Sequence, residues 1–268
     1  MADGDVILDV RGVGHAYGGF WAVRECSFDV PRGSVTGLIG PNGAGKSTLV
    51  EMLSRSLEVH AGSIVYDGME MQRWGPERAA RHGVARTFQT ARVLRRTPVI
   101  ENVLIGAQGQ IGEQPWKAIF RRRAWAGQEE ALRREARELL DWLGLRDHVD
   151  APAGSLSGGQ RRLMEIARAL MARPKLILLD EPTAGVFPEM SRLIAQRVRE
   201  VAADGVTILL VAHNMDFLET VADEVVCMAQ GHVVARGTLD AVRTNEEVIS
   251  AYLGHGSSGV RRRAPEGV

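Results

Sequence analysis

The residues best suited to chemistry stand in a glycine-rich run at positions 40–48, which we call the phosphate loop. It consists of Gly40, Pro41, Asn42, Gly43, Ala44, Gly45, Lys46, Ser47 and Thr48. The run matches the pattern G-x-x-x-x-G-K-[ST], follows an apolar stretch and precedes helix-like sequence from Lys46 to about Leu57. In such a loop the backbone N–H groups surround phosphates, Lys46 reaches the outer phosphates and the Ser47 hydroxyl holds Mg²⁺. The run therefore predicts a nucleotide site, against the simpler alternative of a glycine-rich turn with a chance lysine.

Two adjacent carboxylates follow another apolar run, at residues 176–179. A carboxylate in this position faces the ligand crevice at the carboxyl edge of an open α/β sheet. Asp180 suits a second Mg²⁺ contact through water, and Glu181 suits polarising an attacking water as general base. Alone, an acid after an apolar run also marks a strand that simply meets solvent. Combined with the phosphate loop, the pair predicts a hydrolytic site.

A third candidate lies at the start of a helical stretch. Leu156 is followed there by Ser157, Gly158, Gly159 and Gln160. Serine and glycine at a helix N-terminus offer N–H groups and positive potential to an anion. The alternative is an ordinary serine cap with glycine neighbours, which these residues taken alone favour.

The elements that must position these residues alternate along the chain. Strand-like runs occur at residues 6–10, 26–30, 35–39, 63–66, 84–88, 176–179, 207–212 and 225–228. Between residues 90 and 172 helical patterns take over, including an apolar stripe that ends at Gly144. The stripe consists of Leu132, Ala136, Leu139, Leu140 and Leu143. This alternation predicts an α/β fold with a parallel sheet and helices on both of its faces.

Composition argues against several classes of protein. With 33 basic and 33 acidic residues among 268, the chain lacks the basic excess of a dedicated nucleic-acid binder. Two cysteines, Cys26 and Cys227, cannot form a disulfide framework. The first residues do not resemble a secretory signal, and no run approaches the roughly 18 apolar residues of a membrane span. We therefore expect a cytoplasmic chain with no nucleic-acid partner, whose membrane role is peripheral or through another chain.

The order of the three motifs carries a family resemblance. LSGGQ, at residues 156–160, lies between the phosphate loop and the LILLDE run at residues 176–181. This arrangement resembles the ABC-type ATPases across nearly the whole chain. The resemblance implies ATP and Mg²⁺ as ligands, and an α/β fold with a RecA-like parallel core, an antiparallel β subdomain and an inserted helical subdomain. It implies one ABC domain at about 6–253, with a core from 1–89 and 173–253, a helical subdomain at 90–172 and a disordered tail at 254–268.

The same resemblance assigns further site residues. Gln89 falls at the Q-loop glutamine that contacts Mg²⁺, His213 at the histidine that holds the γ-phosphate, and Tyr17 at the aromatic that stacks on adenine. For Tyr17 the alternative is a surface aromatic in a glycine-rich hairpin. In this family Ser157 and the two glycines after it bind the γ-phosphate held by a second ATPase, so that one chain supplies half of each site.

The catalytic residues that the resemblance implies, Lys46, Glu181 and His213, are all present, but two neighbouring positions depart from the family pattern. Phe187 stands where an Asp or Asn usually links the two half-sites, and its ring has no such donor or acceptor. We expect either slower hydrolysis where this loop contributes or full activity with alignment by backbone groups. Asn214 replaces an Asp after His213, which is a milder change because the amide keeps its hydrogen-bonding capacity.

Outside these motifs the chain is similar to the ATPases of branched-chain amino-acid importers, the LivG type. The similar stretches are GVARTFQ at residues 83–89, PVIENV at 98–103, a helical insert at about 106–135 and VISAYLG at 248–254. They imply an energising subunit, peripheral on the cytoplasmic face of the inner membrane. Its partners would be two permeases, a second and non-identical ATPase, and an extracytoplasmic substrate-binding protein. Urea importers and lipid-extraction transporters share several of these stretches, and a soluble ATPase of iron–sulfur assembly is a further alternative.

Overall fold

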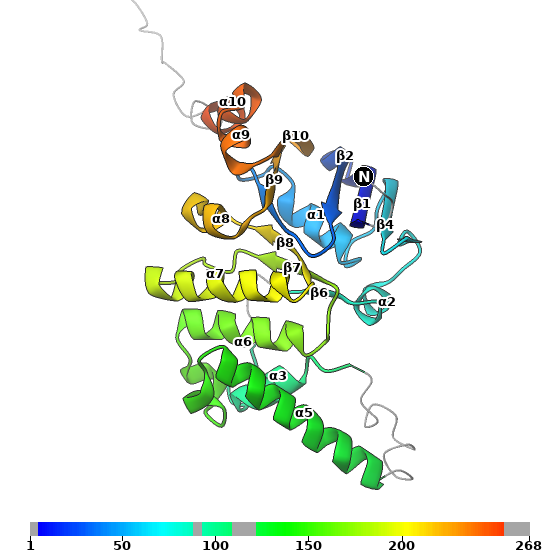
Figure 1. Cartoon of the computed structure of the whole chain (residues 1–268). Coiled ribbons are helices and arrows are strands. Elements are labelled where there is room, and N and C mark those ends of the chain that lie inside the picture. The colour runs from blue at the N-terminus through cyan, green and yellow to red at the C-terminus, as the bar shows by residue number, and fades with distance from the viewer. Residues whose placement is uncertain (1–4, 88–92, 109–121, 255–268) are drawn as a thin grey trace, which may run out of the picture.

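The computed structural model describes residues 5–87, 93–108 and 122–254, and its centre is a six-stranded sheet (Figure 1). The strand order is β10-β9-β3-β8-β7-β6, and all neighbours are parallel except β10, which is antiparallel to β9. The strands are β3 (Val35–Ile39), β6 (Val84–Arg86), β7 (Leu176–Asp180), β8 (Thr207–Val211), β9 (Glu224–Ala229) and β10 (His232–Gly237). Every residue of β3, β7 and β8 is buried, as expected for parallel strands that are covered on both faces.

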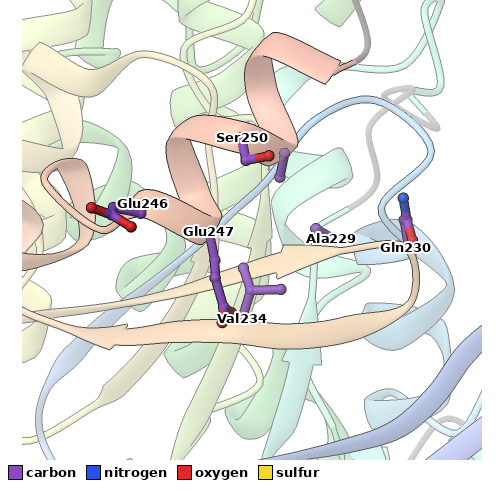
Figure 2. A pocket seen from close by; sticks show the side chains of 7 residues that line it. Ala229, Gln230, Val234, Glu246, Glu247 and Ser250 are labelled. Carbon is purple, nitrogen blue, oxygen red and sulfur yellow. The ribbon is translucent and has the colours of Figure 1, made fainter.

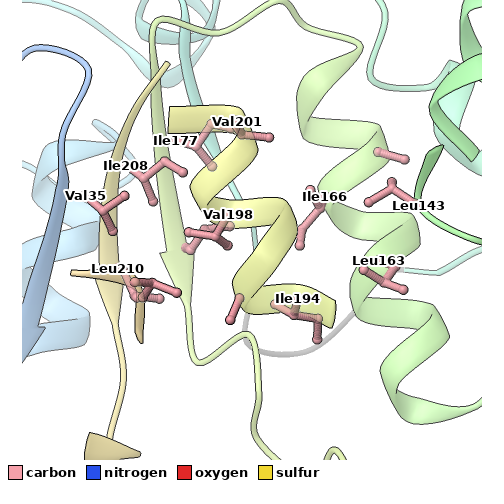
Figure 3. Packing of buried hydrophobic residues seen from close by; sticks show 14 of the residues in the cluster. Val35, Leu143, Leu163, Ile166, Ile177, Ile194, Val198, Val201, Ile208 and Leu210 are labelled. Atoms are coloured by element: carbon pink, nitrogen blue, oxygen red, sulfur yellow. The ribbon is translucent and has the colours of Figure 1, made fainter. Parts of the chain in front are cut away.

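One face of this sheet packs against helix α7 (Pro188–Ala203). Figure 3 shows Val198 of α7 beside strand residues such as Ile208, while Ile166 on helix α6 (Gly158–Leu170) lies on the far side of α7. These side chains belong to one buried cluster that continues from the sheet into the helices. The central sheet and the helical part of the chain therefore share a hydrophobic core.

The other face of the central sheet packs against a second, antiparallel sheet and helix α1 (Lys46–Leu53). This sheet has the order β2-β1-β4-β5. Its strands are β1 (Val6–Tyr17), β2 (Phe20–Pro31), β4 (Ala61–Tyr66) and β5 (Met69–Glu70). Arg236 of β10 joins the two sheets, because its guanidinium pairs with Asp29 of β2 and Glu224 of β9.

The described residues between β6 and β7 form helices and short 3₁₀ turns. They comprise α3 (Val99–Leu104), α5 (Arg122–Trp142), η2 (Arg146–His148), η3 (Ala153–Ser155) and α6. Of the predicted apolar stripe, Ala136, Leu140 and Leu143 are buried, while the other two members are partly buried against the same core. Gly144, with a φ of 72°, follows the end of α5 as predicted.

Several element boundaries differ from the sequence predictions. The helix predicted from Lys46 to about Leu57 ends at Leu53, because Arg55 has a positive φ and the amides after it turn back to Glu51. The strand predicted at residues 84–88 is β6, which ends at Arg86; Thr87 follows it outside the strand, and residue 88 lies outside the described residues. The first two strands are longer than predicted, because bulges interrupt the apolar alternation that sequence reading relies on.

The remaining helices are α2 (Pro76–Arg81), α8 (Met215–Val221), α9 (Leu239–Arg243) and α10 (Glu246–Gly254). They pack against the sheets, and one of them, α8, lies beside α7 on the face of the central sheet that α7 covers. None of the helices in the described ranges is long and apolar enough to span a bilayer.

Candidate functional site

The phosphate loop joins β3 to α1, the strand–loop–helix arrangement that its sequence predicts. Gly40 has a φ of 148° and Gly45 a φ of 97°, which side-chain-bearing residues rarely adopt. A Cβ atom on Gly40 would collide with the carbonyl oxygen of Met228, and one on Gly45 with the carbonyl oxygen of Ala22. Glycine is therefore required at both positions, where the loop passes close to β9 and β2.

Lys46 is buried inside the phosphate loop. Its Nζ donates hydrogen bonds to the carbonyl oxygens of Gly40 at 2.7 Å and Pro41 at 3.0 Å. Burial lowers the pKa of the ammonium, while the charges of Glu181 and Asp180 oppose this shift. Among the described residues, these two carbonyl groups accept the hydrogen bonds of the Lys46 ammonium. They hold the cation inside the loop, and the oxygens of a bound anion can take their place.

The two predicted carboxylates lie at the carboxyl end of β7, but in different environments. Asp180 is buried, and burial raises its pKa, whereas Arg86, with a guanidinium nitrogen 3.9 Å from Asp180 Oδ2, opposes this rise. Glu181 has a φ of 47°, and its Oε1 lies 3.1 Å from Nε2 of His213, which follows the adjacent strand β8. Parallel strands β7 and β8 thus bring together Glu181, the predicted base, and His213, the predicted contact of the γ-phosphate.

A pocket of about 350 Å³ collects most of these groups. It is lined by Phe20, Ala22, Asn42, Gly43, Ala44, Gly45, Lys46, Ser47, Thr48, Glu181, Val211 and His213. Gly40, Pro41, Asp180 and Tyr17 are not among the lining residues, although Lys46 connects Gly40 and Pro41 to the pocket. The pocket therefore unites residues from four segments of the chain that are far apart in sequence.

Phe20 is a lining residue that sequence reasoning missed. It begins β2 and pairs in register with Tyr17 at the end of β1, so both rings stand at the tip of one hairpin. Phe20 is 73% exposed and Tyr17 50% exposed. The signal that could have found Phe20 is its place three residues after Tyr17, because a tight hairpin brings the two together. Gln89 lies outside the described residues.

The LSGGQ residues, 156–160, lie apart from this pocket, at the start of α6 in the helical region (Figure 1). Ser157 caps the helix: its Oγ accepts from the Gln160 amide at 3.3 Å, and its own amide donates to Gln160 Oε1 at 2.9 Å. Ser157 and Gly158 are exposed, whereas Gly159 is buried, and a Cβ there would collide with the Met190 side chain. None of these residues lines the pocket around the phosphate loop.

The two departures from the family pattern have different surroundings. Phe187 is 85% exposed and precedes α7 without providing a side-chain cap. Asn214 caps α8, because its Oδ1 accepts from the amide of Phe217 at 3.0 Å. Asn214 thus has a local structural role that its position after His213 did not indicate.

The residues present fit a magnesium ion that is bound largely by a nucleotide. Among the described residues no group of three or more His, Cys, Asp or Glu side chains is arranged to hold a metal. Mg²⁺ commonly keeps several waters and takes one or two protein oxygens together with substrate phosphates. The exposed Ser47 hydroxyl and the Asp180 carboxylate are donors of this kind, and their binding of Mg²⁺ stays a prediction.

Comparisons with known proteins match most of the chain. A family profile described as "ABC transporter" matches residues 23–184, and one described as "Branched-chain amino acid ATP-binding cassette transporter" matches residues 232–257. The chain is 36% identical to the probable branched-chain amino acid transport ATP-binding protein LivG of Methanocaldococcus jannaschii, over 95% of this chain and 100% of that protein. It is 34% identical to the corresponding protein BraF of Pseudomonas aeruginosa, over 92% and 98% of the two chains.

Solved structures agree with these matches. A nucleotide-free ATP-binding cassette from an ABC transporter superposes with a TM-score of 0.81 at 35% identity, covering 92% of this chain and 98% of that one. A cassette solved in its ADP conformation gives a TM-score of 0.80 at 34% identity, with coverage of 93% and 99%. The fold is thus that of the ABC ATPases, as the sequence predicts. By these matches, and by the site around the phosphate loop, the chain belongs to the ABC transporter family as one of its ATP-binding, ATP-hydrolysing subunits.

Proposed function

We propose that this chain hydrolyses Mg²⁺-bound ATP to drive the import of branched-chain amino acids through a membrane complex. The observation that carries the proposal is the pocket in which the phosphate loop meets Glu181 and His213. The names of the relatives, which are branched-chain amino acid transport proteins, support the substrate class. The second matched profile, at residues 232–257, supports the same branch of the family.

Each pocket residue has a distinct part in this reaction. Phosphate oxygens replace the two carbonyl groups at Lys46, whose charge then offsets that of the outer phosphates. Glu181 accepts a proton from the attacking water, and His213, 3.1 Å from it, orients that water and the γ-phosphate. Ser47 and Asp180 hold Mg²⁺, with Gln89 as a further contact. When bound there, Mg²⁺ would supply neutralisation of the charge on the phosphates.

The base of the nucleotide lies against the hairpin formed by β1 and β2. Ala22 passes beside the end of the phosphate loop, so β2 leads from the phosphates towards Phe20. Phe20 and Tyr17 offer exposed aromatic faces at this end of the pocket. Stacking on such faces suits adenine, and the family resemblance supports Tyr17 as one of the two contacts.

The site becomes complete only when a second ATPase contributes its own LSGGQ segment. Ser157 and Gly158 are exposed and lie outside their own chain's pocket, which supports a role across an interface. Phe187 stands in the segment that the family uses between the half-sites, and its exposure leaves the ring free to meet a partner. We propose that the second ATPase is a non-identical homologue.

The permeases bind at a groove of about 420 Å³ between the central sheet and the helical region. Leu94 and Ile105 line it and are both exposed, which is typical of a surface that a protein partner covers. Glu165 also lines the groove; it is buried, and its Oε1 has no hydrogen-bond partner among the described residues. Through these contacts the chain is held at the cytoplasmic face of the membrane, and a substrate-binding protein outside the membrane delivers the amino acid to the permeases.

The domain arrangement that we propose places the core in residues 1–89 and 173–253 and the helical subdomain in 90–172. Residues 23–184, matched by the ABC transporter profile, cross both parts, which supports a single ABC domain of about 6–253. The proposed disordered tail at 254–268 falls almost wholly outside the described residues.

Reconstitution with the permeases, the second ATPase and the binding protein tests this function. Labelled leucine should enter proteoliposomes only when ATP and the complete complex are present. Glu181→Gln should keep ATP binding while lowering hydrolysis by about 10²–10⁴-fold, because it removes the base but keeps the size of the side chain. Glu189→Gln, which changes an exposed carboxylate on α7, is the matched control. Uptake of urea, or extraction of lipid, in place of leucine would assign the chain to a related transporter.

A further inference from the structure

The two strands of the β1–β2 hairpin are held in place in different ways. Strand β2 is tied to the phosphate loop by the turn between β9 and β10, which Figure 2 shows at Gln230. In this turn the amide of Gly231 donates to the carbonyl oxygen of Ala44 at 3.0 Å, and its carbonyl oxygen accepts from the amide of Arg24 at 2.9 Å. Because Phe20 lies on the same strand as Arg24, its position depends on the phosphate loop.

Strand β1 is irregular close to Tyr17. Its pairing with β4 shifts in register between Arg11 and Gly14, and its pairing with β2 shifts on both sides of His15. A shift of this kind leaves backbone groups without a regular partner in the ladder. The last residues of β1, and the Tyr17 ring that they carry, therefore depend on other contacts for their position.

His60, the residue before β4, supplies such contacts to both neighbours of His15. The His60 amide donates to the carbonyl oxygen of Gly14 at 2.9 Å, and its Nδ1 accepts from the amide of Ala16 at 3.3 Å. A ring nitrogen that accepts carries no proton, so the proton of the neutral His60 ring is on Nε2. His60 thus ties the irregular part of β1 to the start of β4.

The His15 ring contacts the rings of both His60 and Tyr17. It stacks on the His60 ring with 4.2 Å between the centroids, and it meets the Tyr17 ring edge-on with 4.6 Å between the centroids. His15 is 5% exposed, and its Nδ1 lies 2.8 Å from the carbonyl oxygen of Glu58, which places a proton on that nitrogen. Burial, the hydrogen bond and the stacked ring together fix His15, so the half-exposed Tyr17 ring packs on a rigid neighbour.

We propose that His15 and His60 are positioning residues for the base of the nucleotide. The His15 ring restricts rotation of the Tyr17 ring, and His60 holds both His15 and the backbone beside it. A ring that is already ordered loses less conformational entropy when a ligand stacks on it, so the two histidines strengthen base binding. Neither histidine lines the pocket around the phosphate loop, so their effect is confined to ligands that carry a base. The inference rests on the proposed stacking of adenine on Tyr17.

The variants His15→Asn and His15→Phe test this role in the full chain. Asparagine can still donate to the Glu58 carbonyl oxygen but has no ring, whereas phenylalanine keeps a ring and loses the donor. Binding of ATP and of inorganic tripolyphosphate is measured by displacement of a fluorescent ATP analogue. His15→Asn should weaken ATP binding by about threefold to tenfold and leave tripolyphosphate binding unchanged, while His15→Phe should restore most of the ATP affinity. His232→Asn, which changes a partly buried histidine on β10, is the matched control.

His60→Ala supplies an independent test, because His60 is exposed and its replacement threatens folding less than a change at the buried His15. It should weaken ATP binding by about twofold to fivefold, again without an effect on tripolyphosphate. Unchanged ATP affinity in His60→Ala overturns the proposal, and so do equal losses for the two ligands, which a merely structural role would produce. A loss in His15→Phe as large as that in His15→Asn overturns the role of the ring contact.

The failures of the proposed function give different results. If Tyr17→Ala binds ATP as well as the wild type does, the stacking on Tyr17 fails. If the wild-type chain binds neither ATP nor tripolyphosphate, the proposed nucleotide site itself fails. A selective loss of ATP binding in Tyr17→Ala, with no loss in His15→Asn or His60→Ala, overturns the role of the histidines alone.

Discussion

The placement of the base against the β1–β2 hairpin gives a prediction that separates base binding from phosphate binding. Phe20 lines the pocket and is 73% exposed, so replacing it with alanine removes little packing within the protein itself. Tyr17 is more constrained, because its ring meets that of His15 edge-on, with 4.6 Å between the centroids. Phe20→Ala is therefore the cleaner perturbation of the two.

The expected loss of ATP affinity follows from the stacking contact between the Phe20 ring and the base. Replacing an aromatic residue that stacks on a base costs about 1–3 kcal/mol, which corresponds to roughly 5- to 150-fold in affinity. Phe20 stands at the open end of the pocket and has water on much of its surface, so the lower part of this range applies. We expect Phe20→Ala to weaken ATP binding by about tenfold and to leave tripolyphosphate binding unchanged, because the second ligand has no base.

The assay titrates each purified variant with a fluorescent ATP analogue and then displaces it with ATP or with tripolyphosphate. Tyr17→Ala is measured beside Phe20→Ala, and the larger selective loss identifies the ring that carries more of the stacking. Equal losses for ATP and tripolyphosphate in Phe20→Ala would mean that the variant disturbs the phosphate loop. An unchanged affinity for ATP would remove Phe20 from the site. Either result would refute this placement of the base.

Three further predictions concern the partner surface and stability. Ser157→Arg should leave ATP binding by the isolated chain intact but lower the ATPase activity of the assembled transporter by about 10²-fold. The reason is that the bulk of the arginine side chain blocks the phosphate held by the partner. Equal activity of the variant and the wild type would contradict the shared site. Phe187→Asp should raise the ATPase rate of the assembled transporter if the phenyl ring impairs coupling, and a lower rate would show that the ring anchors the interface. Asp67 accepts from Arg32 and Lys175 at 2.6 Å each, and both partners lower its pKa below 3.8. Asp67→Asn should therefore destabilise the chain by about 0.5–1 kcal/mol at pH 7 in urea unfolding. This difference should shrink as the pH falls below about 4, where the aspartate becomes protonated in the unfolded and then the folded chain; a constant difference would exclude the ion pairs as its cause.

Residues whose roles depend on local sequence were predictable. The phosphate loop is a contiguous motif, so its strand, turn and helix follow from neighbouring residues. Glu181 and His213 are distant in sequence, yet each follows a buried apolar strand. Because β7 and β8 are adjacent and parallel, their carboxyl ends meet at one edge, and the two side chains meet at 3.1 Å. Sequence patterns therefore predicted that these two side chains meet, and their catalytic roles stay a prediction.

Residues whose roles depend on contacts between distant segments were not predictable. Phe20 enters the pocket because β2 passes beside the phosphate loop, and its place opposite Tyr17 in a tight hairpin is the one local signal of this. Asn214 caps α8 through an amide three residues away, a role that its departure from the family pattern did not indicate.

Ser157 shows why a structural role and a binding role need not be alternatives. Its Oγ accepts one hydrogen bond from Gln160, but a hydroxyl also carries a proton that it can donate. The first amides of a helix have no partner within the helix, so those of Gly158 and Gly159 remain available beside that proton. The capping box holds these three donors at the positively charged end of α6, and the side chain of Met190 leaves no room for a larger residue than glycine at position 159. The serine cap that the sequence alone favoured is thus compatible with the proposed phosphate site, in which a second chain would bring the phosphate.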